Sequence, residues 1–204
     1  MASFEISAHN PDDRVLKKAV ATLADGGVVI CPTDTFYAFV CTLSNRSGIE
    51  EVCRLVGKKP EKANLSIICS DLKHISDYTQ QFSKSIYKML NRNLPGPFTF
   101  ILKANSKVPR LFLNNRKTLG IRVPDHKVPR LLVELCSEPL VAASVHHPDN
   151  PAEMLTDPYE IETFYGGRVG MLLDAGEGGH TGSAIIDCSG EEPILVREGP
   201  VEIL

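Results

Sequence analysis

The 204-residue sequence lacks the hallmarks of several protein classes. It contains no tryptophan, and aromatic residues make up only 6% of it. No apolar run of about 18 residues occurs, and no basic segment followed by an apolar one stands at the N-terminus, so we expect neither a transmembrane helix nor a signal peptide. None of the six cysteines forms a C-x-x-C pair, which predicts reduced core thiols rather than disulfides or zinc ligands. These absences favour a cytoplasmic protein.

The composition is that of an ordinary globular chain, with 43% hydrophobic and 23% charged residues. This length favours one domain spanning residues 1–204. The net charge of −3 hides an asymmetry, because eight basic residues lie between positions 103 and 130 against the single acid Asp125. From Asp149 onward acids dominate. The basic segment predicts either a local anion-binding surface or a solvated basic face.

Apolar strands alternate with amphipathic helices along the chain, which predicts a single α/β domain with a twisted, mixed sheet. Helices are expected at 11–23, 45–56, 83–90 and 129–136, with a short one opening at 70–72. Strands are expected at 28–31, 39–43, 65–69, 98–102, 118–123, 139–144 and 171–174, followed by a hairpin-like pair at 183–187 and 194–198.

The segment Pro32–Ala38 follows a buried strand and carries polar side chains at its carboxyl end, where open α/β sheets place their ligands. Other strands also end in hydroxyl or cationic residues. The set comprises Thr33, Thr35, Thr99, Arg122, Ser144 and Arg197. Each hydroxyl either faces a shared polar cavity or bonds to the backbone. The two arginines favour the cavity, because a guanidinium stays charged and needs a carboxylate or a phosphate.

Six motifs, in this order, resemble those of the YrdC-like proteins over residues 28–199. They are PTDTFYAF, GKKPEKANLSII, LPGPFTFIL, TLGIRVPDH, PLVAASVHH and SAIIDCSGEEPILVREG. The details resemble the YciO branch of that family most. The resemblance implies helices and a twisted sheet around a large, basic concave cavity, which has been linked with double-stranded RNA binding.

In the synthase members of this family, the cavity holds ATP and L-threonine. The resemblance implies that ATP, L-threonine and bicarbonate react to give threonylcarbamoyl-AMP and pyrophosphate, with Mg²⁺ accompanying ATP. Separate transferase proteins then use the product to modify tRNA. Because this chemistry requires no covalent enzyme intermediate, a cavity lined by hydroxyl and basic side chains suits it. No metal site built from the protein's own side chains is expected.

The motif positions imply roles for individual residues. Those implied to bind nucleotide or threonine are Thr33, Thr35, Tyr37, Lys62, Thr99, Arg122, Ser144, His146, Ser183 and Arg197. Lys58 and Lys59 are the implied catalytic residues, since Lys59 stands where the family has an arginine and Lys58 lies one residue from the family's lysine position.

The same motifs contain departures from the family pattern. Gly57 and Ala63 stand where the family has lysines, and His146 replaces an asparagine amide. His146 and His147 are adjacent on an extended segment, so they point to opposite faces and do not suit one metal ion. His180 lies in a glycine-rich loop that either folds over the cavity or forms a plain surface turn.

Two functional hypotheses therefore remain. The first is a threonylcarbamoyl-AMP synthase, and the second is a non-synthase YciO-type protein that binds nucleotide or double-stranded RNA through the basic cavity. The altered lysine positions favour the second. A regulatory interaction protein without a ligand fits poorly with the basic segment 103–130.

Overall fold

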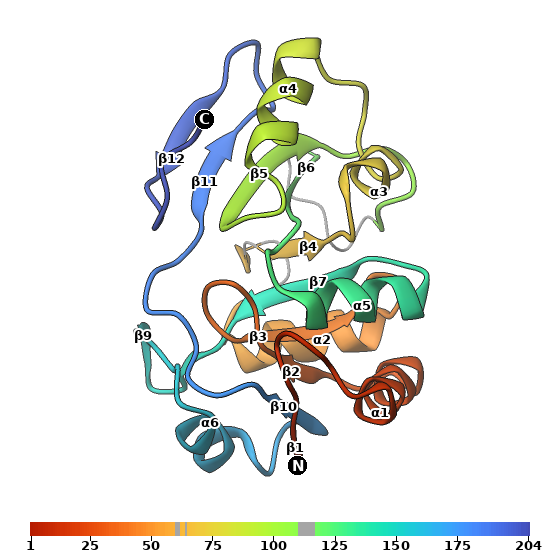
Figure 1. Cartoon of the computed structure of the whole chain (residues 1–204), viewed down its shortest axis with the longest axis vertical. Helices are drawn as coiled ribbons and strands as arrows, with labels where there is room; N and C mark the ends of the chain where they lie inside the picture. The colour runs from red at the N-terminus through yellow and green to blue at the C-terminus, as the bar shows by residue number, and fades with distance from the viewer. Residues whose placement is uncertain (60–61, 64, 110–116) are drawn as a thin grey trace.

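The computed structural model describes residues 1–59, 62–63, 65–109 and 117–204, and ten of its strands form one sheet (Figure 1). The helices are α1 (Asp13–Ala24), α2 (Arg46–Leu55), α3 (Leu72–Ser76), α4 (Lys84–Asn93), α5 (Lys127–Cys136) and α6 (Pro158–Tyr165). The strands are β1 (Ala2–Glu5), β2 (Val29–Cys31), β3 (Ala38–Thr42), β4 (Ser66–Ile68), β5 (Phe98–Lys103), β6 (Thr118–Arg122), β7 (Leu140–Ser144), β8 (His146–His147), β9 (Asn150–Met154), β10 (Met171–Asp174), β11 (Ala184–Asp187) and β12 (Ile194–Arg197).

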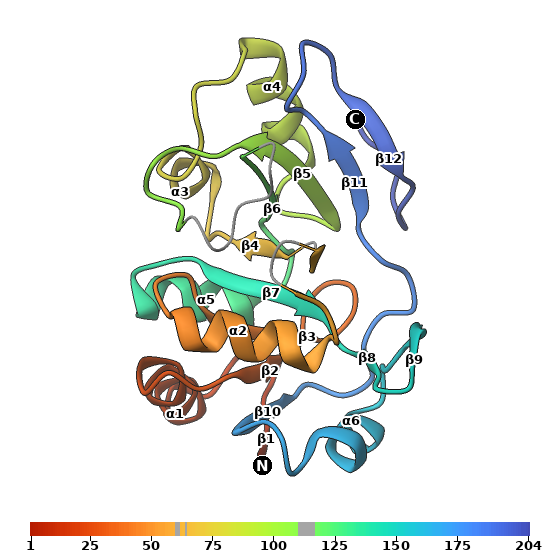
Figure 2. The same ribbon diagram turned by 180° about the vertical axis from the view of Figure 1, so that it is seen from behind.

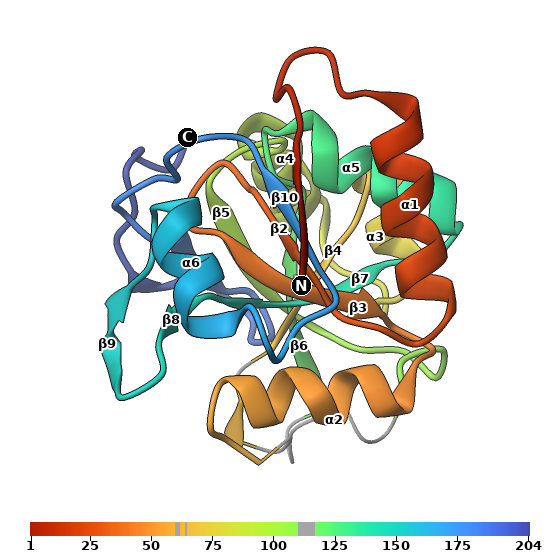
Figure 3. The same ribbon diagram turned by 90° about the horizontal axis from the view of Figure 1, so that it is seen from below.

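The sheet has the strand order β1-β10-β2-β3-β7-β4-β6-β5-β11-β12, and it twists strongly from one end to the other (Figures 1 and 3). Four pairs are parallel (β1 with β10, β10 with β2, β4 with β6, β5 with β11), and the other neighbours in the sheet are antiparallel. Strands β8 and β9 form a separate hairpin. The predicted mixed α/β sheet is therefore confirmed, including the antiparallel pairing of β11 with β12.

Helices cover both faces of the sheet because the central strands are apolar on both sides. All five residues of β3 are buried: Phe39 and Cys41 belong to one core cluster, and Ala38 and Val40 to the other. Helix α2 packs on the first face, whereas α1 and α5 lie together on the second (Figures 2 and 3). Among the described residues, no helix is long and apolar enough to cross a membrane.

Capping side chains set where several helices begin. Asp12 accepts a hydrogen bond from the backbone N–H of Arg14 at 2.7 Å, so α1 begins at Asp13 rather than at the predicted position 11. The ring of His126 accepts from the N–H of Val128 at 3.3 Å, and α5 accordingly begins two residues before the predicted 129. Helix α4 continues to Asn93, three residues past its predicted end.

The structure also contains elements that the sequence patterns did not predict, namely β1, the β8–β9 hairpin and α6. The cysteine prediction is confirmed: all six are free, and only Cys136 is not fully buried.

Candidate functional site

The segment between β2 and β3 is held in shape by its own hydroxyl groups. The Thr33 hydroxyl donates to the Phe36 carbonyl at 2.7 Å and accepts from the Thr35 backbone N–H at 3.1 Å. The two threonine hydroxyl oxygens lie 3.1 Å apart, and the only proton of Thr33 is already used on the carbonyl. Thr35 must therefore donate to Thr33, which leaves the Thr35 oxygen able only to accept further bonds.

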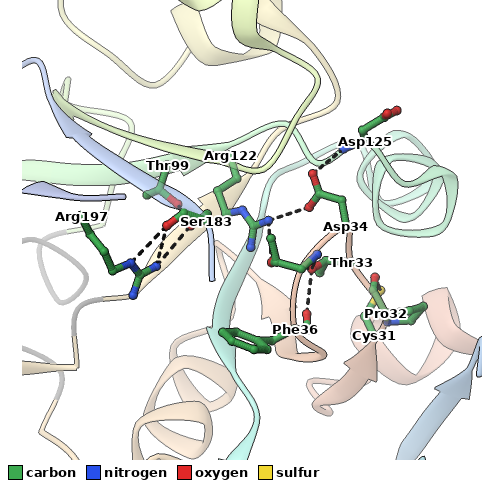
Figure 4. Close-up of polar contacts among 11 residues, drawn as sticks. Cys31, Pro32, Thr33, Asp34, Phe36, Thr99, Arg122, Asp125, Ser183 and Arg197 are labelled. Carbon is green, nitrogen blue, oxygen red and sulfur yellow. Dashed lines mark hydrogen bonds and ion pairs between the residues drawn. The ribbon is translucent and has the colours of Figure 1, made fainter. Parts of the chain in front are cut away.

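Arg122, the last residue of β6, reaches this segment from the other part of the sheet (Figure 4). Its Nη2 donates to Asp34 Oδ1 at 2.6 Å and to the Thr35 hydroxyl at 2.9 Å. The second oxygen of Asp34 accepts from the backbone N–H of Asp125 at 2.9 Å. The expectation that Arg122 needs an anion is thus met partly by Asp34, which is not among the predicted site residues.

A second polar group comes from β5, β12 and the residue before β11. The Thr99 and Ser183 hydroxyls lie 2.7 Å apart, and both residues are buried. Arg197 donates through Nε at 3.1 Å and Nη2 at 2.8 Å to the Ser183 carbonyl (Figure 4). Thr99 and Arg197 both lie opposite Ile185 in the strand register, which puts their side chains on one face of the sheet.

The two groups carry more positive than negative charge. Burial lowers the pKa of the Arg122 guanidinium; Asp34 opposes this shift, and the positive charge of Arg197 adds to it. Two guanidinium groups therefore act on each other, and one carboxylate, that of Asp34 in the β2–β3 loop, pairs with Arg122. The Nε of Arg122 is buried and has no hydrogen-bond partner in the described part of the chain. This arrangement favours an anionic ligand.

Tyr37 secures the loop that leads from β10 to β11. Its hydroxyl donates to the Gly176 carbonyl at 2.6 Å and accepts from the Ala175 N–H at 3.0 Å. Burial raises the pKa of Tyr37 to about 12. Its predicted place in the ligand pocket is untested, but its hydroxyl is already occupied by the loop. In the same loop His180 is exposed and contacts Glu177 at 3.1 Å.

The remaining predicted residues have no described hydrogen bond or ion pair with the two polar groups. Lys58, Lys59 and Lys62 are exposed beyond the end of α2, and Ser144 is exposed at the end of β7, paired with Ala38. Their catalytic and binding roles stay predictions.

His146 is 7% exposed and has structural partners instead. Its Nδ1 lies 2.9 Å from the His147 carbonyl oxygen, and its own carbonyl accepts from the Tyr165 hydroxyl at 2.7 Å. The described residues contain no group of three or more His, Cys, Asp or Glu side chains suited to a metal ion.

The basic segment 103–130 is only partly described, since Arg110 and Arg116 lie outside the described residues. Of its other members, Lys107 contacts Asp77 at 3.5 Å, and Lys127 donates to the His9 carbonyl at 2.6 Å. The large basic cavity therefore remains a prediction.

Several known proteins are similar to this chain in sequence and fold. A family model with the description "Telomere recombination", which covers Sua5, YciO and YrdC proteins, matches residues 21–199. An uncharacterised protein of Haemophilus influenzae is 34% identical over 197 residues, which span 96% of this chain and 94% of the relative. A threonylcarbamoyl-AMP synthase of Halorhodospira halophila is 27% identical over 185 residues, covering 90% of each chain.

The crystal structure of Escherichia coli YciO matches this fold with a TM-score of 0.92 at 32% identity, and the match covers 99% of this chain and 98% of that one. The family model, the relatives that align over nearly the whole chain and the shared fold all agree with the six motifs. The chain therefore belongs to the Sua5/YciO/YrdC family.

Proposed function

We propose that this protein binds ATP and L-threonine at the two polar groups and forms threonylcarbamoyl-AMP. The observation that carries the proposal is the meeting of Arg122 and Arg197 with hydroxyls from the β2–β3 loop, β5 and the start of β11. Because Asp34 offsets only one of the two positive charges, the site is suited to a carboxylate or phosphate group. The synthase relative from Halorhodospira halophila supports the same chemistry.

The proposed reaction needs orientation and charge compensation rather than a covalent intermediate. The threonine amine adds to carbon dioxide derived from bicarbonate and loses a proton, giving a carbamate. A carbamate oxygen then attacks the α-phosphorus of ATP, and the bond from that phosphorus to the bridging oxygen breaks to release pyrophosphate. Lys58, Lys59 and Lys62 are the proposed partners of the phosphates.

Mg²⁺ enters this proposal as a companion of ATP. The Asp34 carboxylate already accepts hydrogen bonds at both oxygens, and the described residues offer no cluster of three metal-binding side chains. The ATP phosphates and water would therefore supply the magnesium ligands, because Mg²⁺ commonly keeps several of its waters.

A second candidate function is nucleotide or double-stranded RNA binding without synthesis. It is favoured by Gly57 and Ala63 at the family's lysine positions and by the engagement of the His146 ring with the backbone. Binding through phosphates alone would weaken steeply with salt and show little sequence preference.

The deciding experiment incubates the protein with ATP, Mg²⁺, L-threonine and labelled bicarbonate, and follows labelled adenylate and pyrophosphate. We expect product, and a loss of about 10²- to 10³-fold in rate on replacing a phosphate-binding lysine by alanine. Lys58→Ala, Lys59→Ala and Lys62→Ala are compared with Lys88→Ala, an exposed lysine of α4. ATP binding without product would favour the second candidate over the synthase. The absence of both ATP binding and product would refute the synthase and the nucleotide-binding form of the second candidate, and would leave only RNA binding.

A further inference from the structure

Asp34 is an acid inside a site proposed to bind anions. Its side chain is only 9% exposed, and that of Arg122 is 10% exposed, so the pair is largely withdrawn from water. A carboxylate at such a place repels a carboxylate or phosphate ligand and costs desolvation energy. Its presence therefore needs a compensating role.

Both carboxylate oxygens of Asp34 accept hydrogen bonds, and both donors lie in the segment 122–125. Oδ1 accepts from Arg122 Nη2 at 2.6 Å, and Oδ2 accepts from the Asp125 N–H at 2.9 Å. Asp34 lies 88 residues before Arg122 in the chain, so this one side chain joins the β2–β3 loop to the end of β6 and the turn after it.

The pair fixes the direction of the guanidinium group. Arg122 Nη2 has two protons, and both are used, one on Asp34 and one on the Thr35 hydroxyl. Because the guanidinium is planar and rigid, fixing this edge fixes the other edge as well. The Arg122 N–H groups that have no partner then point away from Asp34, toward the side on which Figure 4 shows Ser183 and Arg197.

We propose that Asp34 is a positioning residue, which holds the Arg122 guanidinium so that its unspent N–H groups face an anionic substrate beside Arg197. This inference rests on the proposed function in so far as the site takes an anion. It assigns Asp34 an effect through Arg122 and no contact with the substrate.

A purely electrostatic role and a positioning role predict opposite changes in anion affinity when Asp34 is replaced, so the direction of the change tests the inference. If Asp34 acts only through its charge, Asp34→Asn removes a repulsive carboxylate and tightens anion binding. If Asp34 positions Arg122, the same change loosens the guanidinium and weakens anion binding by about 10- to 100-fold.

The experiment measures binding of ATP with Mg²⁺, and separately of inorganic pyrophosphate, to the whole protein by calorimetry. The Nε–H signal of Arg122, assigned with the Arg122→Lys variant, is followed by NMR in the same titrations. The variants are Asp34→Asn, Asp34→Glu and Asp125→Asn. Asp125 is the matched charge control, because it is exposed and its carboxylate has no described hydrogen bond or ion pair with the site.

We expect Asp34→Asn and Asp34→Glu to bind both probes more weakly and to broaden or shift the Arg122 signal, while Asp125→Asn binds as the wild type or slightly more tightly. Asp34→Glu keeps the negative charge but changes its position, so this variant distinguishes the positioning role from the purely electrostatic one if Asp34→Asn does not fold. Unchanged or tighter binding by the folded Asp34 variants would overturn the inference, as would an Arg122 signal that neither probe moves in the wild type.

These outcomes are separable from those of the synthase assay. Product formation with an unmoved Arg122 signal would remove this inference and leave the proposed function. Weakened pyrophosphate binding in Asp34→Asn, together with no product from the wild type, would leave this inference and remove the proposed synthase function.

Discussion

Replacing Tyr37 by phenylalanine tests how firmly the loop between β10 and β11 is held. The Tyr37 hydroxyl bonds to two consecutive backbone groups, the Ala175 N–H and the Gly176 carbonyl, which lie 138 and 139 residues away in the chain. The residue is 1% exposed, and its ring lies against Gly178, so phenylalanine fills the same space. The change removes the two hydrogen bonds and little else.

The expected loss of stability follows from those two bonds. A hydrogen bond contributes about 0.5–1.5 kcal/mol net, and a buried group left unpaired costs about 1–3 kcal/mol. Gly176 is exposed, so water can replace the hydroxyl at its carbonyl, whereas the Ala175 N–H is partly buried. We therefore expect Tyr37→Phe to lose about 1–2 kcal/mol. For a chain of this size that lowers Tm by about 2–8 °C.

Thermal unfolding followed by circular dichroism measures this shift, and amide hydrogen exchange locates it. Exchange should accelerate at 175–182 more than in β5 or β7, since the bonds lie in that loop. Tyr159→Phe is the control, because Tyr159 is 77% exposed. Equal Tm and equal exchange in Tyr37→Phe and the wild type would refute the role given to this hydroxyl.

Two further changes test the loop and a helix cap. In Gly179→Ala the new Cβ would lie 2.7 Å from the Thr35 carbonyl oxygen. We therefore expect the free energy of unfolding, measured in urea, to fall by about 1–3 kcal/mol and the proposed ligand to bind more weakly. The control Gly167→Ala, whose new Cβ has nothing within 4 Å, should be neutral. Burial lowers the pKa of His126, so protonation favours the unfolded chain, and stability should fall as pH drops below about 6.5. His126→Asn keeps a capping acceptor and should reduce this fall; an unchanged pH slope would contradict the assignment.

Much of the fold is predictable from the sequence because its central strands are buried. Val29–Cys31 in β2 and Ile67 in β4 are fully or almost fully buried, and apolar runs bounded by turn residues identify such strands without tertiary information. The edge strand β1 escaped prediction because its residues are mostly exposed and form no apolar run. Helix α6 is short and only weakly amphipathic, and its start depends on the cap at Asp157.

The candidate site was predictable in its residue types but not in its pairings. Hydroxyl and guanidinium groups at strand ends can be read from the sequence, as Thr35 and Arg122 show. Their pairing with each other depends on sheet topology, which places β6 between β4 and β5 in the same sheet as β2 and β3, so that residues 87 positions apart in the chain come into contact. Asp34 was missed for the same reason; the available signal was an acid between two threonines in a segment otherwise suited to anions.

The loop from β10 to β11 connects the two polar groups of the proposed site. Gly179 donates its backbone N–H to the Thr35 carbonyl at 2.7 Å, and four residues later the Ser183 carbonyl accepts both bonds from Arg197. One continuous segment therefore contacts the β2–β3 loop at one end and the β12 arginine at the other (Figure 1). Arg122 contacts the same β2–β3 loop through Asp34 and Thr35, so the relative position of the two guanidinium groups depends on all of these contacts. Displacing the β10–β11 loop would therefore change the proposed anion binding without altering any charge.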